Sequence, residues 1–193
     1  MEITLEQLLA ARDRRAARQL TLTKAWPDRT LVCLTVVLPG PVKRDARSLR
    51  VAAAAVTAVR ARLAPTHEEL YDLPTGYEAY FLIDAPLLDV KRTCCTIENT
   101  HPYGRLMDLD VLEPVWEAPQ LADLPADQLA SQTSGGEVRA ALSSVAVAPV
   151  SRERVGEPPR RCLLCGRPAR ECMRARSHTP AEISAAIDRL LGL

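Results

Sequence analysis

The sequence predicts a single α+β domain in which a mixed sheet is flanked by helices. A length of 193 residues is ordinary for one domain, and a hydrophobic fraction of 47% is enough for a buried core. Short β-branched apolar runs alternate along the chain with longer segments that repeat every three to four residues, which is the pattern of strands interspersed with helices. Aromatic residues make up only 4% of the chain, so aliphatic side chains must supply most of the core.

The first half of the chain predicts two helices and two strands. Residues 5–20 place apolar and small side chains at helical spacing. Residues 31–38 form a β-branched apolar run typical of a buried strand, and the Pro-Gly-Pro that follows ends it. Residues 45–63 are rich in alanine and begin with Asp45, a good N-cap, so they predict a helix. Residues 77–84, apolar and aromatic, predict the second strand.

The second half is less regular. Residues 86–100 predict a helix, although their Thr- and Cys-rich end would also suit a strand. Residues 105–112 alternate as a strand does. Residues 117–158, rich in Pro, Ser and Gly, predict a flexible insertion that includes a short strand at residues 145–147. A capping box with proline at the first helical position predicts a last helix over residues 179–191.

Charge is arranged in blocks although the net charge is only +1. Basic segments at residues 12–29, 43–62 and 152–178 bracket an acidic block at residues 68–127. If these segments converge in space, they can hold a polyphosphate against an acidic, metal-binding centre. Charge alone favours the simpler interpretation of solvated helix faces.

The N-terminal segment has no features of an export signal. It is acidic and amphipathic, and no apolar run approaches the roughly 20 residues of a membrane helix. We therefore expect a cytoplasmic protein that does not bind membranes. In that compartment the six cysteines should be free or metal-bound.

Residues 104–111 carry the first candidate site. On a strand, Asp108 and Asp110 project from the same face, roughly 7 Å apart along the backbone. Two neighbouring carboxylates repel each other unless a cation lies between them, and Mg²⁺ prefers such oxygen ligands. The alternative is a pair of solvent-facing aspartates on an edge strand. Three further polar residues lie within a dozen positions: Glu98, His101 and Arg105.

A Cys/His cluster near the C-terminus is the second candidate site. Cys162 and Cys165 form a Cys-x2-Cys pair, and Cys172 and His178 would complete a tetrahedral zinc set. The spacings match no common zinc finger. We prefer the metal-free interpretation, in which the thiols are packed and the segment of residues 160–178 lies on the main core. Three apolar residues can anchor it there: Leu163, Leu164 and Met173.

The first predicted helix carries a polar stripe. Arg12, Arg15 and Gln19 share one face at helical spacing. Guanidinium groups bind phosphate oxygens in a bidentate manner, so this stripe can contact a phosphorylated ligand. A solvated helix face is the more common role of such a stripe.

Four blocks of residues follow one another in an order that carries more information than any single motif. They are residues 11–19, 35–43, 101–111 and 159–165, the last with Cys172, Arg174 and His178. Together they resemble the citrate lyase holo-acyl-carrier-protein synthase family, also called the apo-citrate lyase phosphoribosyl-dephospho-CoA transferases. Met107 departs from the aromatic residue usual at its position, and residues 117–139 are longer than the family pattern.

The resemblance implies one transferase domain over residues 1–193, with a nucleotidyltransferase-like site. The family moves a 5-phosphoribosyl-dephospho-CoA group from its triphosphate precursor to a serine of the citrate lyase acyl carrier subunit, and pyrophosphate leaves. The resemblance makes Asp108 and Asp110 the Mg²⁺ ligands, with Glu98 or His101 as third ligand or base. The substrate-binding residues it implies are Arg12, Arg15, Gln19, Lys43, Arg105 and Arg161.

Two other classes of function are consistent with parts of the sequence. A non-catalytic assembly factor for the lyase would need neither aspartate. A nucleic-acid-binding module could use the Cys/His cluster, but the weak net charge and the few aromatic residues provide neither a basic field nor a stacking surface. We therefore expect no nucleic-acid partner.

Overall fold

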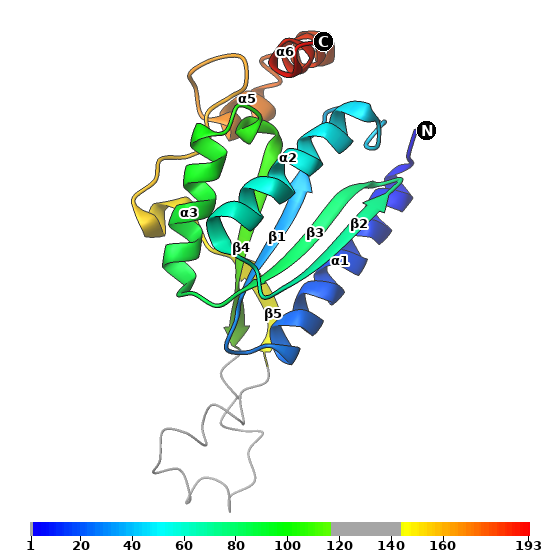
Figure 1. The fold of residues 1–193 in the computed structure, drawn as a ribbon. Helices are drawn as coiled ribbons and strands as arrows, with labels where there is room; N and C mark the ends of the chain where they lie inside the picture. Colours follow the sequence, from blue (N-terminus) through cyan, green and yellow to red (C-terminus); the bar gives the residue numbers. More distant parts are fainter. Residues whose placement is uncertain (1, 117–143) are drawn as a thin grey trace, which may run out of the picture.

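The computed structural model describes residues 2–116 and 144–193. In these residues five strands form one sheet in the order β2-β3-β1-β4-β5 (Figure 1). The strands are β1 (Thr30–Val36), β2 (His67–Leu73), β3 (Gly76–Ile83), β4 (Met107–Trp116) and β5 (Ser144–Pro149). The helices are α1 (Leu5–Ala25), α2 (Ala46–Leu63), α3 (Leu87–Thr100), α5 (Ala169–Ala175) and α6 (Pro180–Leu191), with short 3₁₀ turns at Gly104–Leu106 and Arg152–Val155.

The order of elements from β1 to β4 is that of a ferredoxin-like βαββαβ unit. The predicted α+β class is confirmed, but the predicted mixed pairing is wrong, because every described pair of neighbouring strands is antiparallel. The reason is topological. Helix α2 joins β1 to β2, which run in the same direction, and β3 lies between them; α3 joins β3 to β4 in the same way, with β1 between them.

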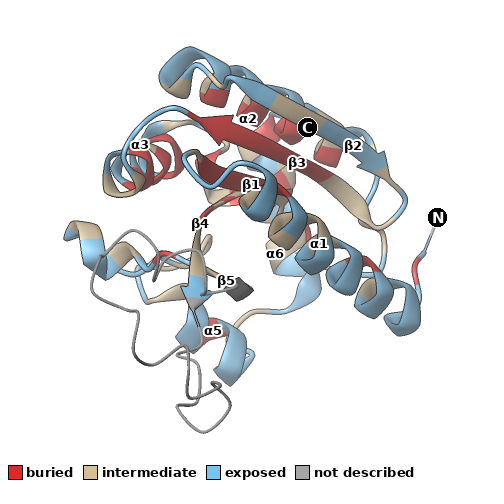
Figure 2. Cartoon of the chain, turned by 90° about the horizontal axis from the view of Figure 1, so that it is seen from below, coloured by how far each residue is buried: buried red, intermediate tan, exposed pale blue. Residues whose placement is uncertain are grey.

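The two faces of the sheet are covered by different helices. Helices α2 and α3 pack on one face over Val32, Leu34 and Phe81, all fully buried (Figure 2). Helix α1 packs on the other face, where Leu22 meets a smaller cluster that includes Cys33. Because side chains alternate along a strand, each strand contributes to both layers.

Helix α2 shows how local sequence sets the helix ends. The Asp45 carboxylate accepts the backbone N–H of Ser48 at 2.9 Å, which caps the first turn. At the other end, Ala64 adopts a left-handed conformation with φ of 43°, and the proline that follows disfavours continuation of the helix. The predicted helix of residues 45–63 is therefore confirmed with its N-cap.

The structure differs from the sequence-based expectation at β2 and at the end of α1. Strand β2 was not anticipated, because it is a largely exposed edge strand with the acidic sequence HEELYDL and no apolar alternation. Helix α1 extends five residues beyond the predicted end. The preference for a helix over a strand at residues 86–100 is confirmed by α3.

The predicted insertion of residues 117–158 has two parts. Residues 117–143 lie outside the described residues. Within residues 144–158, β5 includes the predicted short strand and pairs with β4, and a 3₁₀ turn follows at Arg152–Val155.

The C-terminal segment returns to the main core. Ile187 and Leu191 of α6 are each 1% exposed and join the cluster under α2 and α3, with Leu163 packed against it. Within the described part of the chain, no helix combines the length and hydropathy required to cross a membrane.

Candidate functional site

Asp108 and Asp110 lie on β4 and point to the sheet face that α1 occupies. Their strand partners on β1 are Thr35 and Cys33, and directly paired residues project from the same face. Leu109 between them is 1% exposed in the opposite layer. The shared face predicted for the two carboxylates is therefore confirmed.

The surroundings of the two aspartates differ. Asp108 Oδ1 accepts a hydrogen bond from Arg160 Nη1 at 2.6 Å. Burial raises the pKa of Asp110 to about 6, and the charge of Asp108 raises it further in the same direction. A partly desolvated carboxylate beside a second one favours either a proton or a cation.

Arg15 and Gln19 lie over neighbouring strands on the same face. Arg15 Nη2 donates to Glu78 Oε1 at 2.8 Å, while its Nε is buried without a partner among the described residues. Glu78 is 5% exposed and also accepts from the Tyr80 hydroxyl. Gln19 contacts the Cys33 thiol, which is next to Asp110 in the strand register. The structure thus brings two predicted substrate-binding residues to the face of the acidic pair.

Glu78 was missed by the sequence analysis. A glutamate two positions before Tyr80 in an apolar strand projects from the same face as that tyrosine. In a buried layer it requires a partner of opposite charge. That pattern could have identified the Arg15–Glu78 pair.

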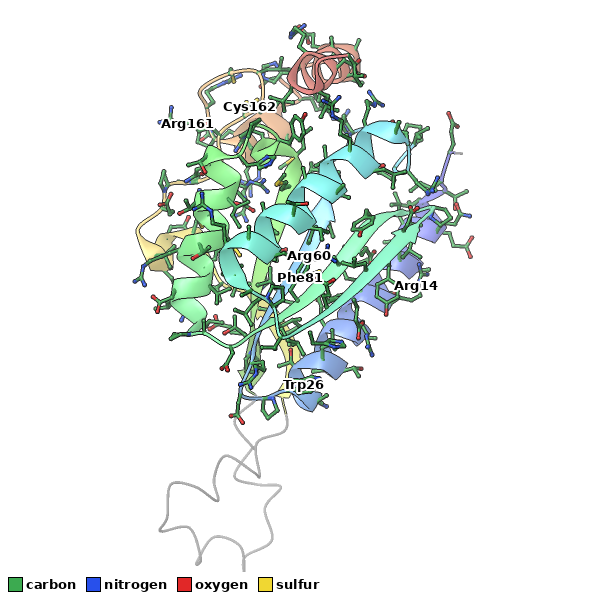
Figure 3. The ribbon with its side chains drawn as sticks, viewed as in Figure 1. Arg14, Trp26, Arg60, Phe81, Arg161 and Cys162 are labelled. Carbon is green, nitrogen blue, oxygen red and sulfur yellow. The ribbon has the colours of Figure 1, made fainter. Side chains whose placement is uncertain are left out.

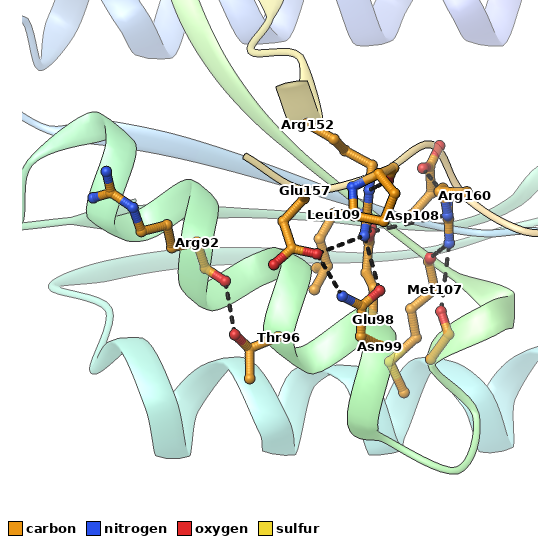
Figure 4. Close-up of polar contacts among 12 residues, drawn as sticks. Arg92, Thr96, Glu98, Asn99, Met107, Asp108, Leu109, Arg152, Glu157 and Arg160 are labelled. Carbon is orange, nitrogen blue, oxygen red and sulfur yellow. Dashed lines mark hydrogen bonds and ion pairs between the residues drawn. The ribbon is translucent and has the colours of Figure 1, made fainter. Parts of the chain in front are cut away.

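Glu98 closes the free edge of β4, where β5 does not extend (Figure 4). Its Oε1 accepts the backbone N–H of Leu109 at 2.9 Å, and its Oε2 accepts Arg152 Nη1 at 2.6 Å. Burial is the largest cause that raises its pKa. Each carboxylate oxygen accepts one of these hydrogen bonds, so Glu98 links the β4 edge to Arg152.

His101, in contrast to Glu98, is placed to donate a hydrogen bond. Its Nδ1 accepts the backbone N–H of Tyr103 at 2.9 Å, which puts the proton of the neutral ring on Nε2. Burial lowers the His101 pKa, which favours that neutral form. His101 can therefore donate a hydrogen bond from Nε2 but has no free lone pair to act as a base there.

Three further basic residues were predicted to bind substrate: Lys43, Arg105 and Arg12. Lys43 Nζ donates to the Leu38 carbonyl at 2.6 Å, and burial lowers its pKa. Burial also lowers the pKa of Arg105, and the charge of Arg160 lowers it further. Arg12 is exposed one turn before Arg15.

Arg161 does not reach this group. It is exposed at the periphery and forms an isolated bridge with Pro168 (Figure 3). The preceding Arg160 takes the inner position, with hydrogen bonds to Asp108 and to the carbonyl of Met107. Side chains alternate in direction along an extended segment, and this alternation could have distinguished Arg160 from Arg161.

The close approach of α3 explains why residue 104 is a glycine. A Cβ at this position would collide with the backbone carbonyl of Glu98 at the end of α3. The glycine therefore allows the chain to pass close under α3 before β4 begins.

The Cys/His cluster forms a second polar site. Cys162, Cys165, Cys172 and His178 place one possible ligand atom each within 4.8 Å of the others. All six cysteines are free thiols.

The fold and the first site define a ferredoxin-like α+β protein whose sheet face presents an acidic pair framed by arginine side chains. Comparison with known proteins refines this class. The chain belongs to the apo-citrate lyase phosphoribosyl-dephospho-CoA transferase family, because the family model of that description matches residues 3–120 and 142–192.

Relatives from several bacteria agree with the family match. A protein of Streptococcus pyogenes named "probable apo-citrate lyase phosphoribosyl-dephospho-CoA transferase" is 34% identical over 192 residues, which are 98% of this chain and 85% of the relative. Proteins of Shigella boydii and Escherichia coli that carry the name without "probable" are each 32% identical over 194 residues, with 98% of this chain and 88% of each relative covered. The matched region contains both aspartates and all four residues of the Cys/His cluster.

Proposed function

We propose that this protein transfers a 5-phosphoribosyl-dephospho-CoA group from a triphosphate donor to a serine of the citrate lyase acyl carrier subunit, with release of pyrophosphate. The family membership supports the donor and acceptor. The observation that carries the chemistry is the pair Asp108 and Asp110 on one sheet face, next to Arg160.

The proposed step is a phosphoryl-group substitution. The serine oxygen forms a bond to the α-phosphorus, the bond from that phosphorus to the bridging oxygen breaks, and pyrophosphate leaves with the bond electrons. The serine proton passes to solvent or to the departing phosphate. Positioning and charge neutralisation account for most catalysis of this type.

The donor set of the acidic pair fits a magnesium ion. Asp108 and Asp110 offer carboxylate oxygens from one strand face, and hard cations prefer oxygen ligands. Bound there, Mg²⁺ would neutralise charge on the triphosphate and on the departing pyrophosphate. Asp110 is half-buried beside Asp108, so a cation would relieve the unfavourable proximity of the two carboxylates.

Arginine and lysine side chains around the pair would bind the donor phosphates. Arg160 already donates a hydrogen bond to Asp108, and burial together with the charge of Arg160 lowers the pKa of Arg105. Arg12 is exposed and free to reach a ligand from α1. Arg15 neutralises the buried Glu78, so its contribution is to fix the layer beneath the ligand.

The test is mass spectrometry of the acyl carrier subunit after incubation with the protein, Mg²⁺ and the triphosphate donor. We expect a mass increase equal to the transferred group and one pyrophosphate per modified serine. Asp108→Asn should abolish the increase, whereas Asp89→Asn, in an exposed pair on α3, should not. If the subunit stays unmodified while lyase assembly still depends on the protein, the assembly-factor function replaces this proposal.

A further inference from the structure

The Cys/His cluster joins three pieces of backbone that are separate in the fold. Cys162 and Cys165 lie on a hairpin, Cys172 on α5, and His178 directly before Thr179, the N-cap of α6. One ligand atom from each lies within 4.8 Å of the other three. We propose that these four residues bind a structural zinc ion in tetrahedral Cys3His coordination.

The dimensions of the cluster suit zinc. With Zn–S bonds of about 2.3 Å, the ligand atoms of a tetrahedral site are separated by roughly 3.8 Å. The Sγ atoms of Cys165 and Cys172 are 3.4 Å apart, and the whole set lies within 4.8 Å. Small shifts of these side chains are enough to form the site.

His178 provides an independent observation. Its Nε2 is buried and has no hydrogen-bond partner among the residues that the structure describes. A buried nitrogen without a partner carries an uncompensated desolvation cost. A bond from this nitrogen to zinc would remove that cost.

The hairpin is arranged to present its sulfur atoms. Cys162 N–H donates to the Arg167 carbonyl and Ala169 N–H donates to the Arg160 carbonyl, each at 2.8 Å. The turn between them directs the backbone N–H of Leu164 to Cys162 Sγ at 3.5 Å. Backbone donors of this kind stabilise a ligand thiolate.

Apolar anchoring of the segment is weak. Met173, expected from the sequence to hold the segment on the core, is 70% exposed, and Leu163 and Leu164 are only partly buried. Short polar segments of this kind are commonly held by a metal or by disulfides. The metal-free interpretation required Met173 to anchor the segment on the core, and the exposed Met173 side chain does not do so.

Zinc at this position would connect the candidate active site to the C-terminal helix. The hairpin starts at Arg160, which binds Asp108, and the cluster ends where α6 begins its contact with the main core. The metal would hold Arg160 at the acidic pair without touching substrate. This role is independent of the identity of the transferred group.

The experiment measures zinc in the full-length protein purified under reducing conditions. We expect one zinc per chain by elemental analysis, and an X-ray absorption spectrum with three sulfur ligands and one nitrogen ligand. Removal by a chelator should lower the melting temperature, and added ZnCl₂ should restore it. Replacement by Co²⁺ should give the visible absorption of a tetrahedral thiolate site.

Matched variants locate the metal. Cys172→Ser and His178→Ala should lose zinc, whereas Cys95→Ser, a buried cysteine outside the cluster, and Asp108→Asn at the acidic pair should retain it. His178→Cys should keep the metal, because cysteine can replace histidine as a zinc ligand. This variant keeps the proposal testable if Cys172→Ser fails to fold. A wild-type protein without stoichiometric zinc, with six titratable thiols and no response to ZnCl₂, would overturn the proposal. A Cys165–Cys172 disulfide, seen as a mass lower by two hydrogens, would also overturn it.

Discussion

Replacing Glu98 by alanine tests whether this residue is part of the β4 edge or part of the chemistry. The change removes the acceptor of the buried Leu109 N–H, which costs about 1–3 kcal/mol. It also leaves Arg152 without its main partner, in a pair whose side chains are only 11% and 7% exposed. Breaking a buried pair costs about 3–5 kcal/mol.

Arg152 keeps two neutral partners after this change. Its Nη2 donates to Asn99 Oδ1 at 2.8 Å and its Nε donates to the Pro158 carbonyl at 2.9 Å. The two losses also share one side chain and are not additive. We therefore expect Glu98→Ala to lower the free energy of unfolding by about 3–5 kcal/mol in total.

The assay is urea unfolding followed by circular dichroism, with two comparison variants. Glu157→Ala removes a more exposed partner of the same arginine, at 3.5 Å, and should cost less than about 1 kcal/mol. Glu98→Gln keeps an oxygen for Leu109 and should retain transfer activity within about tenfold. A Glu98→Ala protein within about 1 kcal/mol of the parent would refute the edge argument, and a folded but inactive Glu98→Gln would assign Glu98 to the catalytic machinery.

Three further outcomes can be measured. Asp110→Asn should lower transfer more than about 100-fold without lowering the melting temperature, because a neutral amide is easier to bury than a carboxylate whose pKa burial has raised to about 6; activity close to the parent's would exclude a metal-binding role. Arg12→Ala should weaken donor binding in calorimetry by about 1–3 kcal/mol and leave stability unchanged. An unaltered affinity would show that Arg12 is a solvated side chain without a role in donor binding. The Arg18 hydrogen bond lowers the Glu69 pKa from 4.5 to about 2, so the stability from this pair is present above pH 4.5 and is lost as the pH falls toward 2. Because Arg18 is 40% exposed, about 1 kcal/mol is expected, measured as a smaller acid destabilisation in Glu69→Gln than in the parent; equal pH profiles would contradict it.

Local signals in the sequence were sufficient for most elements that bury an apolar face or carry a cap. Helix α2 begins after the capping residue Asp45 and ends before the proline that follows residue 64. Helix α6 begins at the capping box of Thr179 and Glu182. The alternation of β4 predicted that Asp108 and Asp110 share a face. Each of these predictions depends on residues within one turn or a few strand positions of each other.

Edge and pairing decisions depended on distant parts of the chain. Strand β2 is an acidic edge strand that is stabilised by its pairing with β3. Because most of its side chains are exposed, its sequence shows no alternation of apolar and polar residues. The strands pair antiparallel because β3 lies between β1 and β2, and β1 lies between β3 and β4. No single segment of the sequence contains the information for this arrangement.

The sequence by itself determined the α+β class, the helix caps, the acidic pair and the family resemblance, because these depend on short-range spacing and residue type. Only the tertiary structure decided the surroundings of these residues. It paired Arg160 rather than Arg161 with Asp108, occupied both oxygens of Glu98, and placed four ligand atoms of the Cys/His cluster within 4.8 Å of one another. The physical reason is that charge pairing and metal coordination require distances of a few ångströms between side chains, and the packing of the sheet, α3 and α6 sets those distances.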